Sequence, residues 1–310
     1  MTTTRSPIGC HGSVWTGSFD EAGLRTAFRG TAEAGFDLVE LPVFDPQSWP
    51  VELTRRLAAE YDLATTASLG LTDDVDISSE DPATVRRGED HLRAVLQVLH
   101  EVGASHLVGV IYGPMKKHQR PATEREVRNG QEAMRRLATY AAALGIRLGV
   151  EIVNRYESNI FNTAAQGRVY VEEVGADNLG VHLDTYHMNI EESGMFAPVL
   201  ETARCLEYVH VGESHRGYLG TGTVDFGSFF RALQLVGYRG PVVFESFSSA
   251  VVDPDLTATL GIWRNLWRDG ADLGAHASTF IRSSLRAVET LDLHRPPRPG
   301  TDPAREDTTP

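Results

Sequence analysis

Cysteine is scarce in this sequence. Only Cys10 and Cys205 occur among 310 residues, and neither belongs to a C-x-x-C pair. This scarcity argues against both a thiolate metal site and a disulfide framework. Reduced, buried cysteines of a cytosolic protein are the simpler interpretation, and we therefore expect a cytoplasmic location.

Long apolar runs are also lacking. No run approaches the 18 or so apolar residues of a membrane span. The N-terminal residues, Met-Thr-Thr-Thr-Arg-Ser-Pro, contain no apolar stretch like that of a secretory signal. The sequence therefore predicts neither membrane insertion nor export.

Positive charge is the third shortage. Lys and Arg number 29 against 42 Asp and Glu, which gives a net charge of −13, and the two lysines are the adjacent Lys116 and Lys117. Such a balance repels phosphate backbones and anionic membrane surfaces. We expect no nucleic-acid partner and no membrane partner.

What the chain does contain is a regular alternation of strand and helix patterns, within a composition that is 41% hydrophobic. Short apolar, β-branched segments predict strands at 8–15, 38–42, 64–69, 105–112, 147–151, 179–184, 206–210 and 241–245. Amphipathic segments predict helices at 20–34, 50–61, 81–102, 124–144, 164–174, 195–204 and 226–236, with extra C-terminal helices at 255–267 and 274–291.

This alternation predicts an α/β protein with a single (β/α)8 TIM-barrel domain over residues 8–292. A doubly wound open sheet is the main alternative. Residues 1–7 are expected to be a flexible N-terminus. Residues 293–310 are rich in proline and charge without apolar periodicity, so we expect a disordered tail.

Polar residues end four successive predicted strands: Glu151, Asp184, His210 and Glu245. Their spacing is close to the roughly 31 residues per strand–helix unit of a barrel of about 250 residues. Parallel strands would bring all four to the C-terminal rim, where three carboxylates would repel one another unless a divalent cation neutralised them. The alternative is four unrelated polar residues, because barrel rims are polar anyway.

The segments after these strands carry further polar residues. Glu157, His187 and Arg216 follow within a few positions and could bind sugar hydroxyls, although solvated loop charge is the usual fate of such residues. His182 precedes Asp184 by two positions, so it shares that strand face but lies deeper, below the rim. We interpret it as a structural histidine with satisfied hydrogen bonds, or as one that supports the ligands from behind, rather than as a ligand. The glycine-rich turn 217–222 would have only Arg216 to balance a phosphate, which favours a neutral substrate.

Three of these segments together resemble the ketose 3-epimerases, the D-tagatose and D-allulose (D-psicose) 3-epimerases of the xylose-isomerase-like barrels. They are 151–157 (Glu-Ile-Val-Asn-Arg-Tyr-Glu), 182–192 (His-Leu-Asp-Thr-Tyr-His-Met-Asn-Ile-Glu-Glu) and 210–216 (His-Val-Gly-Glu-Ser-His-Arg). The resemblance extends through 9–16, 67–70 and 243–247, and it covers about residues 8 to 292.

The resemblance implies a metal-dependent isomerase that epimerises free ketoses at carbon 3 through a metal-stabilised cis-enediolate. D-Fructose and D-allulose are the implied substrates, with D-tagatose, D-sorbose and L-ribulose as further candidates. Glu151, Asp184, His210 and Glu245 would bind one Mn²⁺, Co²⁺ or Mg²⁺ per subunit, and Glu151 and Glu245 would also exchange protons with the sugar. Glu157, His187 and Arg216 would hold the ketose, and the subunits would form a homodimer or homotetramer.

Other functions on the same scaffold are alternatives. They include another sugar or sugar-phosphate isomerase or epimerase, such as a hydroxypyruvate-type isomerase, and a lyase that cleaves C-glycosides. An apurinic endonuclease would need a His-rich three-zinc site and a basic face, which a net charge of −13 disfavours. A non-catalytic sugar-binding barrel would not need two opposed metal-bound glutamates.

Leu260, Trp263 and Trp267 have the spacing of one helical face. The simpler interpretation is that this stripe packs on the outer wall of the barrel. The alternative is a subunit interface, because aromatic residues are enriched at interface centres.

Overall fold

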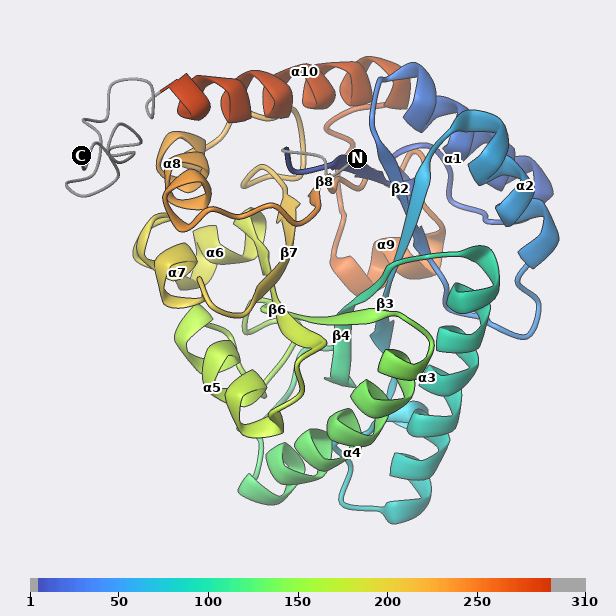
Figure 1. Ribbon diagram of the computed structural model, residues 1–310, viewed down its shortest axis with the longest axis vertical. Helices are drawn as coiled ribbons and strands as arrows, with labels where there is room; N and C mark the ends of the chain where they lie inside the picture. The colour runs from blue at the N-terminus through green and yellow to red at the C-terminus, as the bar shows by residue number, and fades with distance from the viewer. Residues whose placement is uncertain (1–4, 291–310) are drawn as a thin grey trace, which may run out of the picture.

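The computed structural model describes residues 5–290 and shows a closed barrel of parallel strands in sequence order (Figure 1). The strands are β1 (Ile8–His11), β2 (Leu38–Pro42), β3 (Ala64–Leu71), β4 (His106–Pro114), β5 (Arg147–Glu151), β6 (Leu179–Asp184), β7 (Leu206–Val211) and β8 (Val242–Phe244). Gly9 of β1 pairs with Val243 of β8, and this pairing closes the barrel. The predicted single (β/α)8 domain is confirmed, and the open-sheet alternative is wrong.

Helices surround the strands (Figure 1). They are α1 (Glu21–Glu33), α2 (Val51–Tyr61), α3 (Pro82–Val102), α4 (Glu124–Ala143), α5 (Ala164–Val174), α6 (Thr185–Glu191), α7 (Ala197–Glu201), α8 (Phe226–Val236), α9 (Pro254–Leu260) and α10 (Gly270–Glu289). Short 3-10 helices lie at Gly12–Val14 and Asp73–Val75. The last helix, α10, packs against both α8 and α1 and so completes the outer ring.

Side-chain caps fix where several helices begin. The Asp20 carboxylate accepts the Gly23 N–H at 2.9 Å at the start of α1. Thr123 and Glu126 form a capping box at the start of α4. These oxygens satisfy backbone donors that a helix leaves unpaired in its first turn, so the predicted helix starts at these positions are confirmed.

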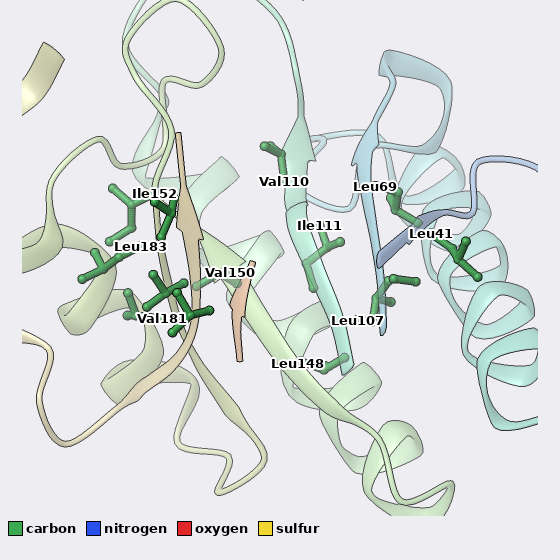
Figure 2. Close-up of a cluster of buried hydrophobic side chains, with 14 of the residues drawn as sticks. Leu41, Leu69, Leu107, Val110, Ile111, Leu148, Val150, Ile152, Val181 and Leu183 are labelled. Carbon is green, nitrogen blue, oxygen red and sulfur yellow. The ribbon is translucent and has the colours of Figure 1, made fainter. Parts of the chain in front are cut away.

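Two sets of apolar side chains fill the fold. The larger set lies between the strands and the helices, and Figure 2 shows part of it. A smaller set, Leu38, Val108, Tyr208 and Val243, comes from four different strands and packs together. Only the barrel interior brings β2, β4, β7 and β8 into contact, so this set is the interior core.

The polar residues of the rim lie directly above this interior core. Side chains two positions apart share one face of a strand. Glu40 therefore follows Leu38, His210 follows Tyr208 and Glu245 follows Val243 on the interior side. The core thus supports the polar layer from below.

Most element boundaries differ from the predictions by a few residues, and four differences change how a segment is interpreted. β1 ends at His11 because Gly12–Val14 forms a 3-10 helix. The segment after β6, expected to be a loop, forms α6, and α7 is shorter than the predicted helix 195–204. Helix α9 ends at Leu260 because Gly261 adopts a left-handed conformation with φ +66°.

The prediction that Leu260, Trp263 and Trp267 share one helical face is therefore wrong, because the helix stops before both tryptophans. Trp267 is 4% exposed, and its indole N–H donates to Ser246 Oγ at 2.8 Å. Trp263 is 77% exposed. Trp267 is thus part of the core, whereas Trp263 lies on the surface.

Residues 1–4 and 291–310 lie outside the described part of the chain. The flexible N-terminus predicted for 1–7 and the disordered tail predicted for 293–310 stay predictions. Within the described part, Arg5 pairs with Glu289 at 3.1 Å, and the Val242 N–H donates to Pro7 O at 3.0 Å. Between residues 5 and 290, no helix has the length and apolar character needed to cross a membrane.

The contrast between the two tryptophans yields a prediction. Trp267→Ala should lower the free energy of unfolding by about 3–5 kcal/mol, because it removes a buried indole and leaves a cavity. Trp263→Ala should change it by less than about 1 kcal/mol, because its side chain remains in water. Chemical denaturation of both variants measures the difference, and equal losses would contradict the assignment of Trp267 to the core.

Candidate metal centre and active site

The barrel brings the four strand-end residues into one buried cluster. Glu151 ends β5, Asp184 ends β6, His210 lies near the end of β7, and Glu245 follows β8. Their exposures are 7%, 0%, 0% and 7% in that order. One ligand atom from each lies within 4.8 Å of the others. An imidazole and three carboxylates at this spacing form a donor set suited to a divalent transition metal or Mg²⁺.

His210 tests whether a cation fits this cluster. Its Nδ1 lies 3.4 Å from Glu245 Oε1 and 3.8 Å from Glu151 Oε1. This nitrogen is buried and has no hydrogen-bond partner within the described residues. A buried nitrogen without a partner is costly, and a metal ion between it and the two carboxylates would satisfy it. The residues therefore fit a metal.

The pKa values of the carboxyl groups reflect crowding. Burial raises the pKa of Glu151 to about 8, and the charges of Glu245 and Asp184 add to this effect. Burial likewise raises the pKa of Asp184. Burial alone would raise the pKa of Glu245 too, but the charges of Arg216, His210 and His11 together outweigh burial, and the pKa of Glu245 is lowered. A cation among these groups would favour their ionised forms.

Arg216 is the guanidinium of this site. Its Nη1 lies 3.5 Å from Asp184 Oδ2 and donates a hydrogen bond to Glu245. The guanidinium stacks over the Tyr186 ring, 3.9 Å from its centroid. The backbone of Arg216 is left-handed, with φ 61°, a conformation that costs energy for a non-glycine residue. The surrounding loop must therefore hold Arg216 in place.

Glu213 organises that loop from within. Its buried carboxylate accepts the backbone N–H groups of Ser214 at 2.9 Å and Gly220 at 2.8 Å. At Gly222 a Cβ atom would lie 2.3 Å from Glu213 Oε1, so the loop can approach this closely only with glycine there. The predicted flexible turn 217–222 is thus wrapped around a fixed carboxylate, a role of Glu213 that the sequence analysis missed.

His187 and Glu157 meet beside the cluster. His187 lies on α6 rather than in the expected loop, and its Nε2 is 3.6 Å from Glu151 Oε1 and 3.9 Å from Glu157 Oε2. Burial lowers the pKa of His187 well below its ordinary value, and Arg216 lowers it further. Burial raises the pKa of Glu157 to about 7. The two side chains therefore face the same space with little net charge.

Asn154 connects these two residues. Its Nδ2 donates to Glu157 Oε1 at 2.9 Å and to His187 Nδ1 at 2.8 Å. Because His187 Nδ1 accepts this bond, the ring carries its proton on Nε2, which faces the site. The sequence analysis noted Asn154 only as a loop residue.

Glu40 is a buried carboxylate that the sequence analysis did not select. It is 0% exposed, and His210 Nε2 lies 2.9 Å from its Oε2. Glu40 also belongs to a second group of potential ligands with His11 and Glu245. His11 Nδ1 accepts the Ser13 N–H at 3.2 Å, so its proton is on Nε2, which is hydrogen-bonded to Ser68 Oγ at 3.2 Å and lies 3.7 Å from Glu40 Oε1. His11 is therefore a hydrogen-bond donor here rather than a ligand.

His182 lies below the rim as expected, but its hydrogen bonds are not satisfied. Both ring nitrogens are buried without a partner in the described part of the chain. Its Nδ1 is 4.0 Å from Glu151 Oε2, and its ring packs edge-on against His210. Of the two predicted roles, a ring satisfied by hydrogen bonds from the described residues is wrong, whereas a supporting role behind the ligands stays a prediction. Glu151, His182 and His210 also form a further group with ligand spacing.

A pocket opens above the cluster and is lined by charged groups at its base and apolar groups at its mouth. Its lining includes Glu151, Glu157, His187, Arg216 and Glu245, together with His11, Phe44, Gly70, Met115, Phe247, Leu256 and Leu260. Neither lysine lines it: Lys116 pairs with Asp73 and Lys117 stacks on Tyr156. All seven residues selected from the sequence thus meet at or beneath this pocket.

Comparison with known proteins adds an independent line of evidence. A family model described as the xylose isomerase-like TIM barrel matches residues 28–273. The ketose 3-epimerase of Arthrobacter globiformis is 58% identical over 287 residues, covering 93% of this chain and 99% of the relative. The L-ribulose 3-epimerase of Methylomonas sp. (strain DH-1) is 51% identical over 278 residues, covering 90% and 97%.

Solved structures agree with these relatives. The D-allulose 3-epimerase from Methylomonas sp. in complex with D-allulose superposes with a TM-score of 0.89 at 50% identity, covering 90% of this chain and 97% of that one. An L-ribulose 3-epimerase superposes with a TM-score of 0.90 at 38% identity, covering 94% and 100%. The similarity therefore spans nearly the whole length of both proteins.

Proposed function

This chain belongs to the xylose isomerase-like TIM-barrel family and, within it, to the ketose 3-epimerases, and on that premise we propose that it epimerises free ketoses at carbon 3 with one divalent cation per subunit. The observation that carries the proposal is the buried set of Glu151, Asp184, His210 and Glu245, in which His210 Nδ1 has no hydrogen-bond partner among residues 5–290. We propose these four residues as the metal ligands, with Mn²⁺ or Co²⁺ preferred and Mg²⁺ as a further candidate.

The reaction requires a proton to leave carbon 3 and another to return on the opposite face. When bound, the cation would act as a Lewis acid toward the oxygens of carbons 2 and 3. Glu151 and Glu245 come from β5 and β8, at the two ends of the row of ligand strands. One glutamate takes the proton, which leaves an enediolate of the sugar, and the other donates a proton to the opposite face. Carbon 3 keeps its oxidation state, so no redox cofactor is needed.

The remaining polar groups of the pocket would hold the substrate. His187 presents its Nε2–H toward the site because Asn154 occupies Nδ1, and this N–H can donate to a sugar oxygen. Glu157 can accept or donate, since its pKa of about 7 places both forms near neutrality. Arg216 already compensates Asp184 and Glu245, so it has little charge to spare for a phosphate. This balance supports a free ketose as the substrate.

D-Fructose and D-allulose are the substrate pair we propose first. A solved relative from Methylomonas sp. binds D-allulose, and another relative from that genus is named L-ribulose 3-epimerase. L-Ribulose, D-tagatose and D-sorbose are therefore further candidates. We also propose the cytoplasm as the location, which the two free cysteines, Cys10 and Cys205, support.

Finally, we propose that the subunits form a homodimer or homotetramer, with α8 and the segment after β8 in the contact. Leu235 of α8 is 49% exposed, and Trp263 is 77% exposed. Exposed large apolar side chains of this kind are candidates for a contact with another subunit.

Metal removal is the first test. Dialysis against EDTA should abolish the conversion of D-fructose to D-allulose, and adding Mn²⁺ or Co²⁺ should restore it. Chromatography of the sugar products measures this conversion. Adding metal at 100 times its dissociation constant should stabilise the fold by about 2.7 kcal/mol, because it binds the native state only. Full turnover in demonstrably metal-free protein would contradict the metal site. A metal-restored activity that yields no D-allulose would point to another isomerase or a lyase.

The two proposed proton-transfer residues should be separable from the other ligands. Glu151→Gln and Glu245→Gln keep an oxygen near the metal but cannot accept a proton, so each should lower kcat by roughly 10²–10⁴-fold. Metal content, measured by mass spectrometry of the dialysed protein, should fall less than in Asp184→Ala or His210→Ala. Near-normal turnover in either glutamine variant would rule out the two-glutamate mechanism.

The assembly proposal is tested by light scattering. At micromolar concentration the mass should be two or four times that of the 34.0 kDa chain, and a monomer mass would contradict it. Leu235→Asp should lower the mass by placing a charge in the contact. Val169→Asp on α5 is a matched control, because Val169 is 42% exposed and lies on another helix, so its mass should not change.

A further inference from the structure

Glu40 is a charged residue in the middle of an apolar strand. It lies in β2 between Val39 and Leu41, and all three side chains are almost completely buried. A buried carboxylate costs several kcal/mol unless it is paired and hydrogen-bonded. The barrel could close around an apolar residue at this position, so the pairing of Glu40 should show what the carboxylate is for.

The partners of Glu40 are specific. His210 Nε2 lies 3.1 Å from Oε1 and 2.9 Å from Oε2. The Tyr208 hydroxyl donates to Oε2 at 2.7 Å, and it is itself bonded to Thr66 Oγ1 at 2.7 Å. Both oxygens of Glu40 are therefore used, and the closest ring nitrogen belongs to the proposed metal ligand His210.

This arrangement decides which nitrogen of His210 faces the other ligands. Since Glu40 accepts the Nε2–H, the lone pair of a neutral His210 is on Nδ1. That atom lies 3.4 Å from Glu245 Oε1 and 3.8 Å from Glu151 Oε1, and no donor in the described part of the chain occupies it. The ring is fixed both in tautomer and in orientation.

We propose that Glu40 is a positioning residue for the metal centre, which holds His210 with its proton on Nε2 and thereby directs Nδ1 toward the cation. This inference rests on the metal site of the proposed function. A carboxylate behind a ligand histidine also makes the imidazole a stronger donor, and loss of such a partner costs about 10–100-fold in metal affinity or activity. Glu40 should therefore tighten metal binding without touching either metal or sugar.

A second His–Glu pair in the same barrel provides a matched control. His106 Nε2 lies 3.1 Å from Glu207 Oε1, and each of these side chains is 12% exposed. Glu207 precedes Tyr208 on β7 and also pairs with Arg147, so it lies away from the metal ligands. Replacing Glu207 removes a comparable ion pair but leaves the metal centre intact.

The experiment compares Glu40→Gln with Glu207→Gln in the full-length protein. Glutamine keeps the size of glutamate but loses its charge. Metal-free protein is titrated with Mn²⁺ in competition with a chelator, and the visible absorption of the Co²⁺ form is recorded. Glu40→Gln should weaken Mn²⁺ binding by about 10–100-fold and alter the Co²⁺ spectrum. Glu207→Gln should lower thermal stability but leave Mn²⁺ affinity and the Co²⁺ spectrum within error of the wild type.

Wild-type Mn²⁺ affinity together with an unchanged Co²⁺ spectrum in Glu40→Gln would overturn the proposal, as would an equal loss of affinity in both variants. If Glu40→Gln does not fold, Glu40→Asp is tested in its place. Aspartate keeps the negative charge, but its side chain is one methylene shorter, so the carboxylate lies farther from His210. It should bind Mn²⁺ more weakly than the wild type, and unchanged affinity would overturn the proposal. These readouts do not depend on epimerisation, so a wild-type protein that binds metal but does not convert D-fructose would count against the proposed function alone.

Discussion

The site depends on how the protein accommodates buried carboxylates in the mouth of one barrel. Four of them are the proposed ligands Glu151, Asp184 and Glu245 and the neighbouring Glu40, all almost inaccessible to water. Glu40 is paired with His210, and Arg216 contacts both Asp184 and Glu245. Of the three proposed carboxylate ligands, Glu151 is the one that no arginine or lysine of the described residues contacts, and burial raises its pKa to about 8. The negative charge that the protein compensates least is therefore that of Glu151. A bound cation would stabilise the site most at this residue, and its carboxyl group can exchange a proton near neutral pH.

The loop after β7 contains a strained backbone conformation at the mouth of the barrel. Arg216 is held in a left-handed backbone conformation, with φ 61°, and Ser246 Oγ donates to its carbonyl oxygen. The same loop closes around the buried carboxylate of Glu213, which accepts N–H groups on both sides of the turn. Strain of this kind persists only where the surroundings over-determine it. Arg216 is thus fixed before any substrate arrives, so its ordering need not be completed on binding.

Sequence periodicity was sufficient to predict the barrel and the four strand-end residues, because both follow from the repeat of strand and helix and from the parallel direction of the strands. Sequence periodicity was less reliable for features that depend on local backbone geometry, such as the end of a helix. Gly261 ends α9 and separates Trp263 from Trp267, and a single glycine within an apparently helical pattern does not reveal this. The rule that selected Glu151, a polar residue at the end of a strand, does not find Glu40, which lies in the middle of β2, although a charged residue within an apolar strand is itself a signal in the sequence. Its partner His210 lies 170 positions away, however, and only the closed barrel shows that pairing.

Different strands of the closed barrel supply the proposed metal ligands and some of the residues that hold these ligands in place. The proposed ligands come from β5 to β8, whereas the residues that hold them come from the other strands. Glu40 of β2 holds His210, and the Tyr112 hydroxyl of β4 donates to the carbonyl oxygen of Glu151 at 2.9 Å. His11 of β1 lies beside Glu40 and packs its ring against Phe247, next to the end of β8. A metal centre requires its ligands to be fixed within a fraction of an ångström. In this chain part of that precision comes from strands that supply no ligand, because Glu40 of β2 is bonded to His210 and Tyr112 of β4 is bonded to the backbone of Glu151.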